Sequence, residues 1–205
     1  LNCRKLNQKW STYFSIIHMR ELKIEILKDE IENFKVDEEN SYLNSYQEFI
    51  EYFKNVTKIE KHHLVISSHF VYGWMPTILK LKLTNLDEVL SILNKAKTNE
   101  ILNSNELEIL RLSINNSLVG SSKLLHFINP KIYPIWDSKI FKYWSGNKTT
   151  YGIQKPENYL KFTEQISRIV KNKEFPEIQK RIEKLLKYKV SSVRALELLI
   201  FQSYK

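Results

Sequence analysis

Apolar side chains recur at the spacing of an amphipathic helix through almost the whole chain, and this periodicity is the strongest constraint on its fold. Phe49 and Phe53 stand four residues apart, and Leu107, Leu110 and Ile114 follow one another three and four residues apart. No two strand-like segments joined by a two-residue turn stand out. The pattern predicts a mainly α protein, a bundle of about nine or ten helices.

Residues that favour helix ends divide this pattern into segments. Asp137 is expected to cap a helix over residues 138–144, because its side chain can accept from the first free N–H groups. Pro156 and Pro176 stand where first-turn prolines belong. Ser191 or its neighbour Ser192 is expected to cap the last helix.

Positive charge is concentrated in the last part of the chain. Residues 1–120 carry 15 basic and 16 acidic side chains, a net charge of −1, whereas residues 121–205 carry 17 basic and 7 acidic ones, a net charge of +10. Such a segment favours an anionic partner, nucleic acid above all. We expect a single helical domain over 1–205, with 1–60 and 61–205 as candidate subdomains.

Composition excludes several classes of site. The single cysteine, Cys3, excludes an intrachain disulfide and a cysteine-based zinc site, and four glycines leave no glycine-rich nucleotide loop. His62 and His69 would need distant carboxylates to bind a metal, so we expect neither a metal nor a cofactor. No apolar run is long enough to span a membrane, and the first ten residues lack a signal-like apolar segment. We therefore expect a cytoplasmic, nucleoid-associated protein.

Residues 117–144 read as two helices joined by a tight turn and followed by a proline-rich link. Asn115-Asn116 and Gly120 are expected to form the turn, and Ser121 or Ser122 to cap a short helix. A helix N-terminus after such a turn can bind a phosphate through its free N–H groups. We expect DNA phosphates to contact Gly120, Ser121, Ser122 and Lys139.

Two residues of this stretch have the chemistry of a catalytic pair. Lys123 follows the turn, and Asp137 closes the sequence Pro-Ile-Trp-Asp that begins at Pro134. The arrangement resembles the helix-hairpin-helix (HhH-GPD-like) DNA glycosylases, and among them the 8-oxoguanine glycosylase/lyase branch in its small bacterial form. The resemblance covers about 28 residues, with WMPTILKL at 74–81 as a second similar segment. It implies that Lys123 and Asp137 are the catalytic residues.

The chemistry of base excision explains why such residues would be needed. A neutral lysine amine can attack C1′ of the sugar and form a Schiff base, and a carboxylate stabilises the positive charge that develops on the sugar. The target base leaves the stack, and aromatic side chains can hold it. The expected substrate-binding residues are Trp136, Tyr133, Trp144, Trp74 and His126.

Simpler roles remain open for the same residues. Asp137 can be an ordinary helix cap, Lys123 a solvated lysine, and Trp136, Trp144 and His126 parts of the core. The first hypothesis is a glycosylase/lyase acting on double-stranded DNA with a damaged or modified purine such as 8-oxoguanine. The second is a non-enzymatic helical DNA-binding protein, such as a phage-defence or mobile-element accessory. The third is a protein–protein module that binds an acidic partner.

Overall fold

The computed structural model describes residues 19–37, 39–75 and 77–204, and in these ranges it contains ten α-helices and no named strand. The mainly α class is therefore confirmed. The helices are α1 (Ile24–Ile31), α2 (Ser41–Lys54), α3 (Lys61–Gly73), α4 (Leu86–Lys97), α5 (Ser104–Ser113), α6 (Leu118–Ile128), α7 (Ser138–Ser145), α8 (Pro156–Val170), α9 (Phe175–Leu186) and α10 (Ser192–Ser203). None of them combines the length and apolar character that a membrane span requires. Residues 1–10, for which the sequence predicts no signal-like segment, lie outside the described ranges.

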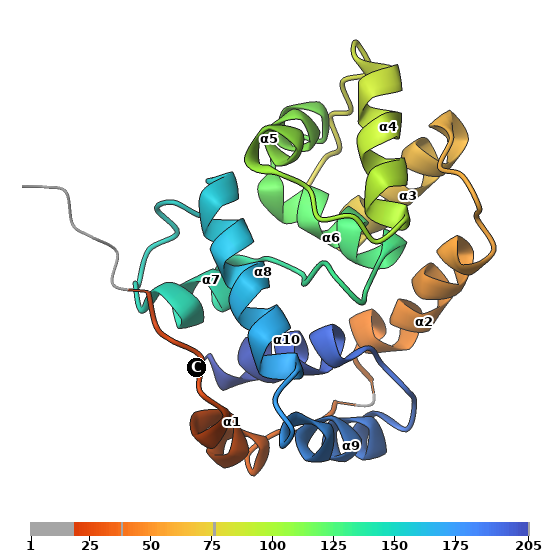
Figure 1. Ribbon diagram of the computed structural model, residues 1–205. Helices are drawn as coiled ribbons and strands as arrows, with labels where there is room; N and C mark the ends of the chain where they lie inside the picture. Colours follow the sequence, from red (N-terminus) through yellow and green to blue (C-terminus); the bar gives the residue numbers. More distant parts are fainter. Residues whose placement is uncertain (1–18, 38, 76, 205) are drawn as a thin grey trace, which may run out of the picture.

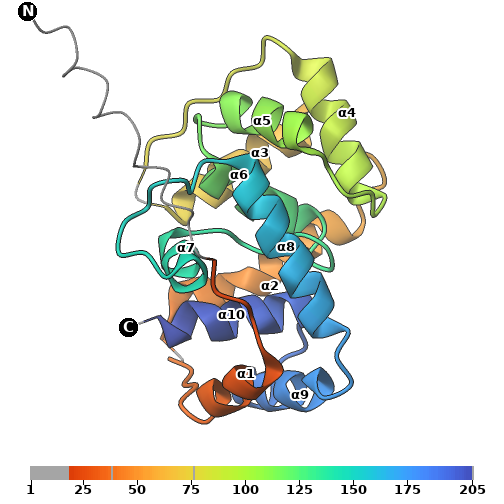
Figure 2. The same ribbon diagram turned by 60° about the vertical axis from the view of Figure 1, so that its left-hand side comes forward.

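The helices gather in two groups. Figure 1 and Figure 2 both place α3, α4, α5 and α6 together, and α1, α9 and α10 together on the other side, with α2, α7 and α8 between them. Helix α10 packs against α7, α8 and α9, and α6 packs against α3 and α5. Helix α1 joins α9 through the ion pairs Lys28–Glu174 and Arg181–Glu32, so the first and the ninth helix lie side by side.

Several helix ends follow directly from the sequence. The Asp137 carboxylate accepts a hydrogen bond from the Ile140 N–H at 2.9 Å and caps α7. The Ser191 hydroxyl accepts from the Arg194 N–H at 3.0 Å and caps α10. Pro156 is the first residue of α8, and α9 also carries a proline in its first turn. These predictions are confirmed.

The turn between α5 and α6 lies earlier in the chain than the sequence indicated. Asn115 and Asn116 both adopt left-handed backbone angles, at φ values of 59° and 53°, which asparagine tolerates better than most residues. Ser117, rather than Ser121 or Ser122, caps α6, and its hydroxyl accepts from the Gly120 N–H at 3.1 Å. Gly120 therefore lies in the first turn of α6.

The expected phosphate contacts of Gly120, Ser121 and Ser122 need correction. All three residues are buried. The Ser121 hydroxyl donates to the Ser117 carbonyl at 3.0 Å, and the Ser122 hydroxyl donates to the Val119 carbonyl at 2.9 Å. The N–H of Leu118, the first residue of α6, has no partner within the helix and donates to the Gln154 side-chain oxygen at 2.7 Å. The polar groups of this turn are thus used inside the protein, and these side chains do not reach solvent.

Gly120 is required by packing rather than by a turn. A Cβ atom at this position would lie 2.3 Å from the Tyr72 Oη atom and 2.8 Å from Cζ of the same ring. We expect Gly120→Ala to lower the free energy of unfolding by about 1–3 kcal/mol, because the buried ring must move. Urea unfolding measures this loss. Gly73→Ala is the matched control: its Cβ would meet nothing within 4 Å, so a comparable loss there would contradict the packing argument.

Candidate functional site

Lys123 and Asp137 line the same cavity, whose volume is about 430 Å³. The cavity lies where the start of α2, the end of α3, α6, the start of α7 and α10 come together. The residues that line it are Asn40, Tyr42, Leu43, Trp74, Lys123, Ile135, Asp137, Lys139, Arg194, Glu197, Leu198, Phe201 and Gln202. The two residues singled out in the sequence therefore face one space, together with charged and aromatic side chains from distant segments.

Lys123 presents an unpaired amine to this cavity. It lies on α6 and is half-buried, and within the described part of the chain it makes no hydrogen bond and no direct ion pair. Burial lowers the pKa of the Lys123 amine, and the nearby Arg194 guanidinium lowers it further, while the Asp137 and Glu197 carboxylates oppose the shift. The positive charge that adds to the effect of burial is that of Arg194 on α10. A lysine in this state is more readily deprotonated than a surface lysine.

Asp137 combines a structural and an electrostatic role. Its hydrogen bond from the Ile140 N–H fixes the carboxylate at the N-terminus of α7. Burial raises the pKa of Asp137, whereas the Ile140 N–H and the Lys123 amine act in the opposite direction. The cap thus holds the carboxylate in one orientation within the electrostatic reach of Lys123. The two interpretations of Asp137, helix cap and charge at a reactive site, are compatible.

Arg194 and Glu197 are two charged residues of the cavity that the sequence analysis missed. They lie three residues apart on α10, and both are buried. The Arg194 guanidinium donates to the Glu197 carboxylate at 2.5 Å, and Arg194 also lies over the Tyr46 ring at 4.5 Å. A signal was present, because two opposite charges interrupt the otherwise apolar run of α10 at helical spacing. Such a pair inside an apolar helix indicates a buried ion pair.

Three aromatic side chains line the cavity. Trp74 was expected here; its indole N–H donates to the Ser45 hydroxyl at 3.0 Å, and its ring meets Tyr42 edge-on at 5.6 Å. Tyr42 and Phe201 were missed, since neither lies near residues 117–144 in the sequence. The Lys139 amine lies 4.7 Å from the centre of the Phe201 ring. Flat apolar surfaces and charged groups therefore share this space.

No protein-family model, curated protein or solved structure matches this chain.

The remaining aromatic residues expected at the substrate belong to the core. Trp136 and Trp144 are completely buried and pack together at 5.5 Å between ring centres, with Phe162 5.0 Å from Trp136. Tyr133 is 2% exposed, and its hydroxyl donates to the Glu100 carbonyl. These three residues do not line the cavity, so their expected contact with a base is corrected to core packing.

His126 is also a core residue rather than a substrate contact. It is completely buried, and its Nδ1 atom lies 2.7 Å from the Tyr133 carbonyl, which can only accept a hydrogen bond. Nδ1 therefore carries the proton, and Nε2 accepts from the Tyr46 hydroxyl at 2.8 Å. Burial lowers the pKa of His126 to about 3. The neutral ring joins α6, α2 and the link before α7.

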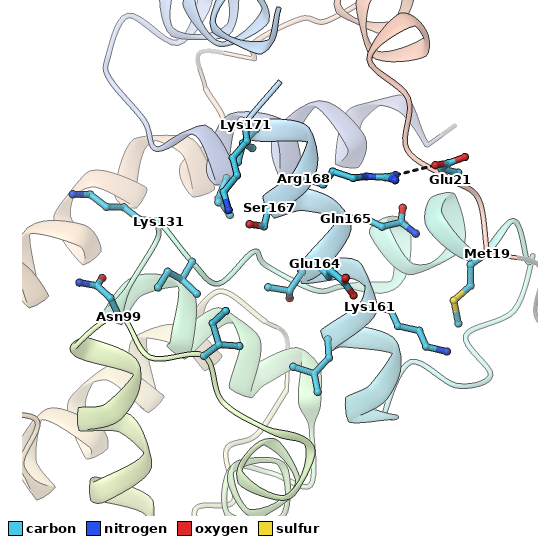
Figure 3. A pocket seen from close by; sticks show the side chains of 16 residues that line it. Met19, Glu21, Asn99, Lys131, Lys161, Glu164, Gln165, Ser167, Arg168 and Lys171 are labelled. Carbon is cyan, nitrogen blue, oxygen red and sulfur yellow. Dashed lines mark ion pairs between the residues drawn. The ribbon is translucent and has the colours of Figure 1, made fainter. Parts of the chain in front are cut away.

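A second, larger cavity of about 1080 Å³ runs along the outer side of α8. In Figure 3, Lys161, Arg168 and Lys171 project from α8 into its surroundings, and Arg168 pairs with Glu21. The charges that line it are of both signs, and neither Lys123 nor Asp137 is among its lining residues. The smaller cavity is lined by the buried ionisable residues Arg194 and Glu197, and it is therefore the candidate active site.

The histidines of α3 form a helix cap. The ligand atoms of Glu60, His62 and His63 lie within 4.8 Å of one another, a spacing compatible with a metal ion. However, the Nδ1 atom of His63 accepts a hydrogen bond from the Glu60 N–H at 3.0 Å, and the Glu60 side chain in turn caps α3. The Nδ1 lone pair of His63 is thus used in the helix cap. The His69 Nδ1 atom lies 2.8 Å from the Val65 carbonyl, one turn earlier in α3.

Proposed function

We propose that the protein is a DNA glycosylase with AP-lyase activity, which excises a damaged or modified purine such as 8-oxoguanine through a Schiff base on Lys123. The observation that carries the proposal is the shared cavity, which is lined both by the half-buried Lys123 and by Asp137, whose carboxylate caps α7. The sequence resemblance to helix-hairpin-helix glycosylases supports the same pair. The aromatic rings of Trp74, Tyr42 and Phe201 supply surfaces on which a base could stack.

The proposed reaction requires a neutral amine at C1′ of the sugar. An ordinary lysine, with a pKa of about 10.4, is almost entirely protonated at neutral pH. The burial of Lys123 and the nearby guanidinium of Arg194 both lower this pKa and so increase the reactive fraction. The amine then attacks C1′, and the bond between C1′ and the base breaks with its electron pair going to the base. The Asp137 carboxylate stabilises the positive charge that develops on the sugar.

Double-stranded DNA is the partner that the charge distribution favours. Residues 121–205 hold a net charge of +10, and both members of the proposed catalytic pair belong to this segment. Lysines and arginines around the site would contact phosphates and make binding depend strongly on salt. Lys139 is exposed and lies on the rim of the cavity, so it remains the proposed phosphate contact near the reactive groups.

Borohydride trapping tests the proposal directly. The protein is incubated with duplexes that contain an abasic site or 8-oxoguanine, in the presence of borohydride, which reduces a Schiff base to a stable amine. We expect a covalent protein–DNA adduct with both duplexes. Salt-sensitive binding to the duplexes without any adduct would instead favour a non-enzymatic DNA-binding protein. Absence of binding even at low salt would favour a protein–protein module.

Asp137→Asn separates the two roles of this residue. Asparagine caps a helix about as well as aspartate, so the free energy of unfolding should change little. The substitution removes the negative charge, and we expect base release to slow by about 10²-fold because the developing positive charge loses its partner. Single-turnover release of 8-oxoguanine measures the rate. Base release at the wild-type rate in a folded variant would show that Asp137 is only a cap.

A further inference from the structure

Glu197 supplies a second carboxylate to the cavity that holds Lys123 and Asp137. It is 2% exposed and lies on α10 among buried apolar neighbours such as Leu196 and Leu198. A carboxylate in such surroundings costs free energy unless its oxygens are hydrogen-bonded. Apolar packing would favour an apolar side chain at this position, so packing alone does not explain a glutamate on the cavity wall.

Two fixed hydrogen bonds orient this carboxylate. Its Oε1 atom accepts from the Arg194 guanidinium at 2.5 Å, and its Oε2 atom accepts from the Ile135 N–H at 3.1 Å. Each oxygen of a carboxylate can accept two hydrogen bonds, so these contacts leave an acceptor position on each oxygen. Both Glu197 and Lys123 line this cavity, and its volume of about 430 Å³ is large enough to hold water.

The groups behind Glu197 do not exchange protons with it. His126 has its Nδ1 atom 3.8 Å from Glu197 Oε2, but that nitrogen donates to the Tyr133 carbonyl and the ring stays neutral. Tyr46 donates to the other ring nitrogen of His126. Burial raises the pKa of the fully buried Tyr159 hydroxyl well above its usual value, so it keeps its proton too. Among the residues that the structure describes, only groups that line the cavity can therefore exchange a proton with Glu197.

The electrostatics of Glu197 suit a proton acceptor. Burial raises the pKa of the Glu197 carboxyl, and Asp137 raises it further, whereas Arg194 and the Ile135 N–H act in the opposite direction. Burial lowers the pKa of Lys123 at the same time. The two shifts bring the acidity of the ammonium and the basicity of the carboxylate closer, which makes transfer from one to the other less unfavourable.

We propose that Glu197 accepts, through a water in the cavity, the proton that the Lys123 ammonium loses before it attacks DNA. The inference rests on the proposed function. The proton moves to the Glu197 carboxylate, and the neutral amine forms a bond to C1′ while the bond between C1′ and the base breaks. The departing base takes the electron pair and then the proton from the Glu197 carboxyl, which restores the carboxylate. Glu197 thus acts first as the general base for Lys123 and then as the general acid for the departing base.

The rate of adduct formation as a function of pH tests this role. In the wild type, we expect the single-turnover trapping rate to rise with pH as Glu197 ionises. In Glu197→Gln, we expect that rise to disappear and the rate at neutral pH to fall by about 10²-fold. Glu164→Gln is the matched control, because Glu164 is exposed on the other cavity and its loss removes the same charge. The control should keep the wild-type profile.

A purely electrostatic role predicts the opposite result. The Glu197 carboxylate raises the pKa of Lys123, so its removal would then speed trapping and move the profile to lower pH. That outcome, or an unchanged profile, overturns the inference. Glu197→Gln leaves the Arg194 charge buried without its partner, so the double variant Arg194→Gln/Glu197→Gln is measured beside it. We expect at least the same loss of rate in the double variant, because Arg194 also lowers the pKa of Lys123. Failure of the wild type to form any adduct would instead overturn the proposed function itself.

Discussion

Replacement of Lys123 by glutamine is expected to abolish the covalent adduct with DNA, a loss of roughly 10³-fold or more in trapping. Glutamine keeps a polar side chain on α6 but has no amine that can form a Schiff base. The measurement is borohydride trapping on an abasic-site duplex, followed by mass spectrometry of the linked peptide. In the wild type, the linked residue should be Lys123.

The same substitution, Lys123→Gln, should leave the stability of the protein unchanged or increase it. Lys123 is half-buried and has no direct ion-pair partner among residues 19–37, 39–75 and 77–204. Its positive charge is therefore poorly compensated, and a neutral side chain removes a desolvation cost. We expect Lys123→Gln to unfold at the wild-type denaturant concentration or a higher one. A residue whose removal abolishes activity and spares stability has the property expected of a reactive group.

Lys139 provides the control for this experiment. It lines the same cavity, but it is exposed, and its amine lies over the Phe201 ring. Lys139→Gln makes the same change of charge at the same site and should still form the adduct. If Lys123→Gln traps DNA as well as Lys139→Gln does, the nucleophile is another residue and the assignment of Lys123 is wrong.

The helices could be predicted because their ends are encoded locally. Asp137 and Ser191 cap α7 and α10 within three residues of their own positions. The mistake at Gly120 has the opposite cause. Glycine suggested a turn, but the residue is small because the Tyr72 ring, 48 positions earlier, occupies the space beside it. The turn itself uses Asn115 and Asn116, which reach left-handed angles without glycine.

The candidate site could be predicted only in part, for the same reason. Lys123 and Asp137 lie in one short stretch, so a local pattern was enough to suggest the pair. Arg194 and Glu197 enter the cavity from α10, and only the packing of α10 against α7 brings them there. Aromatic residues are equally ambiguous in sequence, because a ring suited to stack on a base is equally suited to a core. Trp74 and Trp136 illustrate the two outcomes.

Replacement of Trp136 by alanine is expected to lower the free energy of unfolding by about 3–5 kcal/mol. The ring is completely buried and lies 5.0 Å from Phe162 and 5.4 Å from Phe141, measured between ring centres. Its indole N–H also donates to the Ile153 carbonyl at 2.8 Å, which would lose its partner. The substitution thus combines a large void with an unsatisfied buried acceptor. Urea unfolding followed by circular dichroism gives the value.

Trp74→Ala is the informative comparison, because Trp74 is only half-buried and lines the cavity. Its loss should reduce stability less than that of Trp136 and should weaken base release more, once both variants are measured under conditions where they are folded. Trp136→Ala is therefore expected to cause the larger loss of stability, and Trp74→Ala the larger loss in the rate of base release. A smaller stability loss for Trp136→Ala than for Trp74→Ala would contradict the assignment of Trp136 to the core. Trp136 would then again be a candidate for contact with a base.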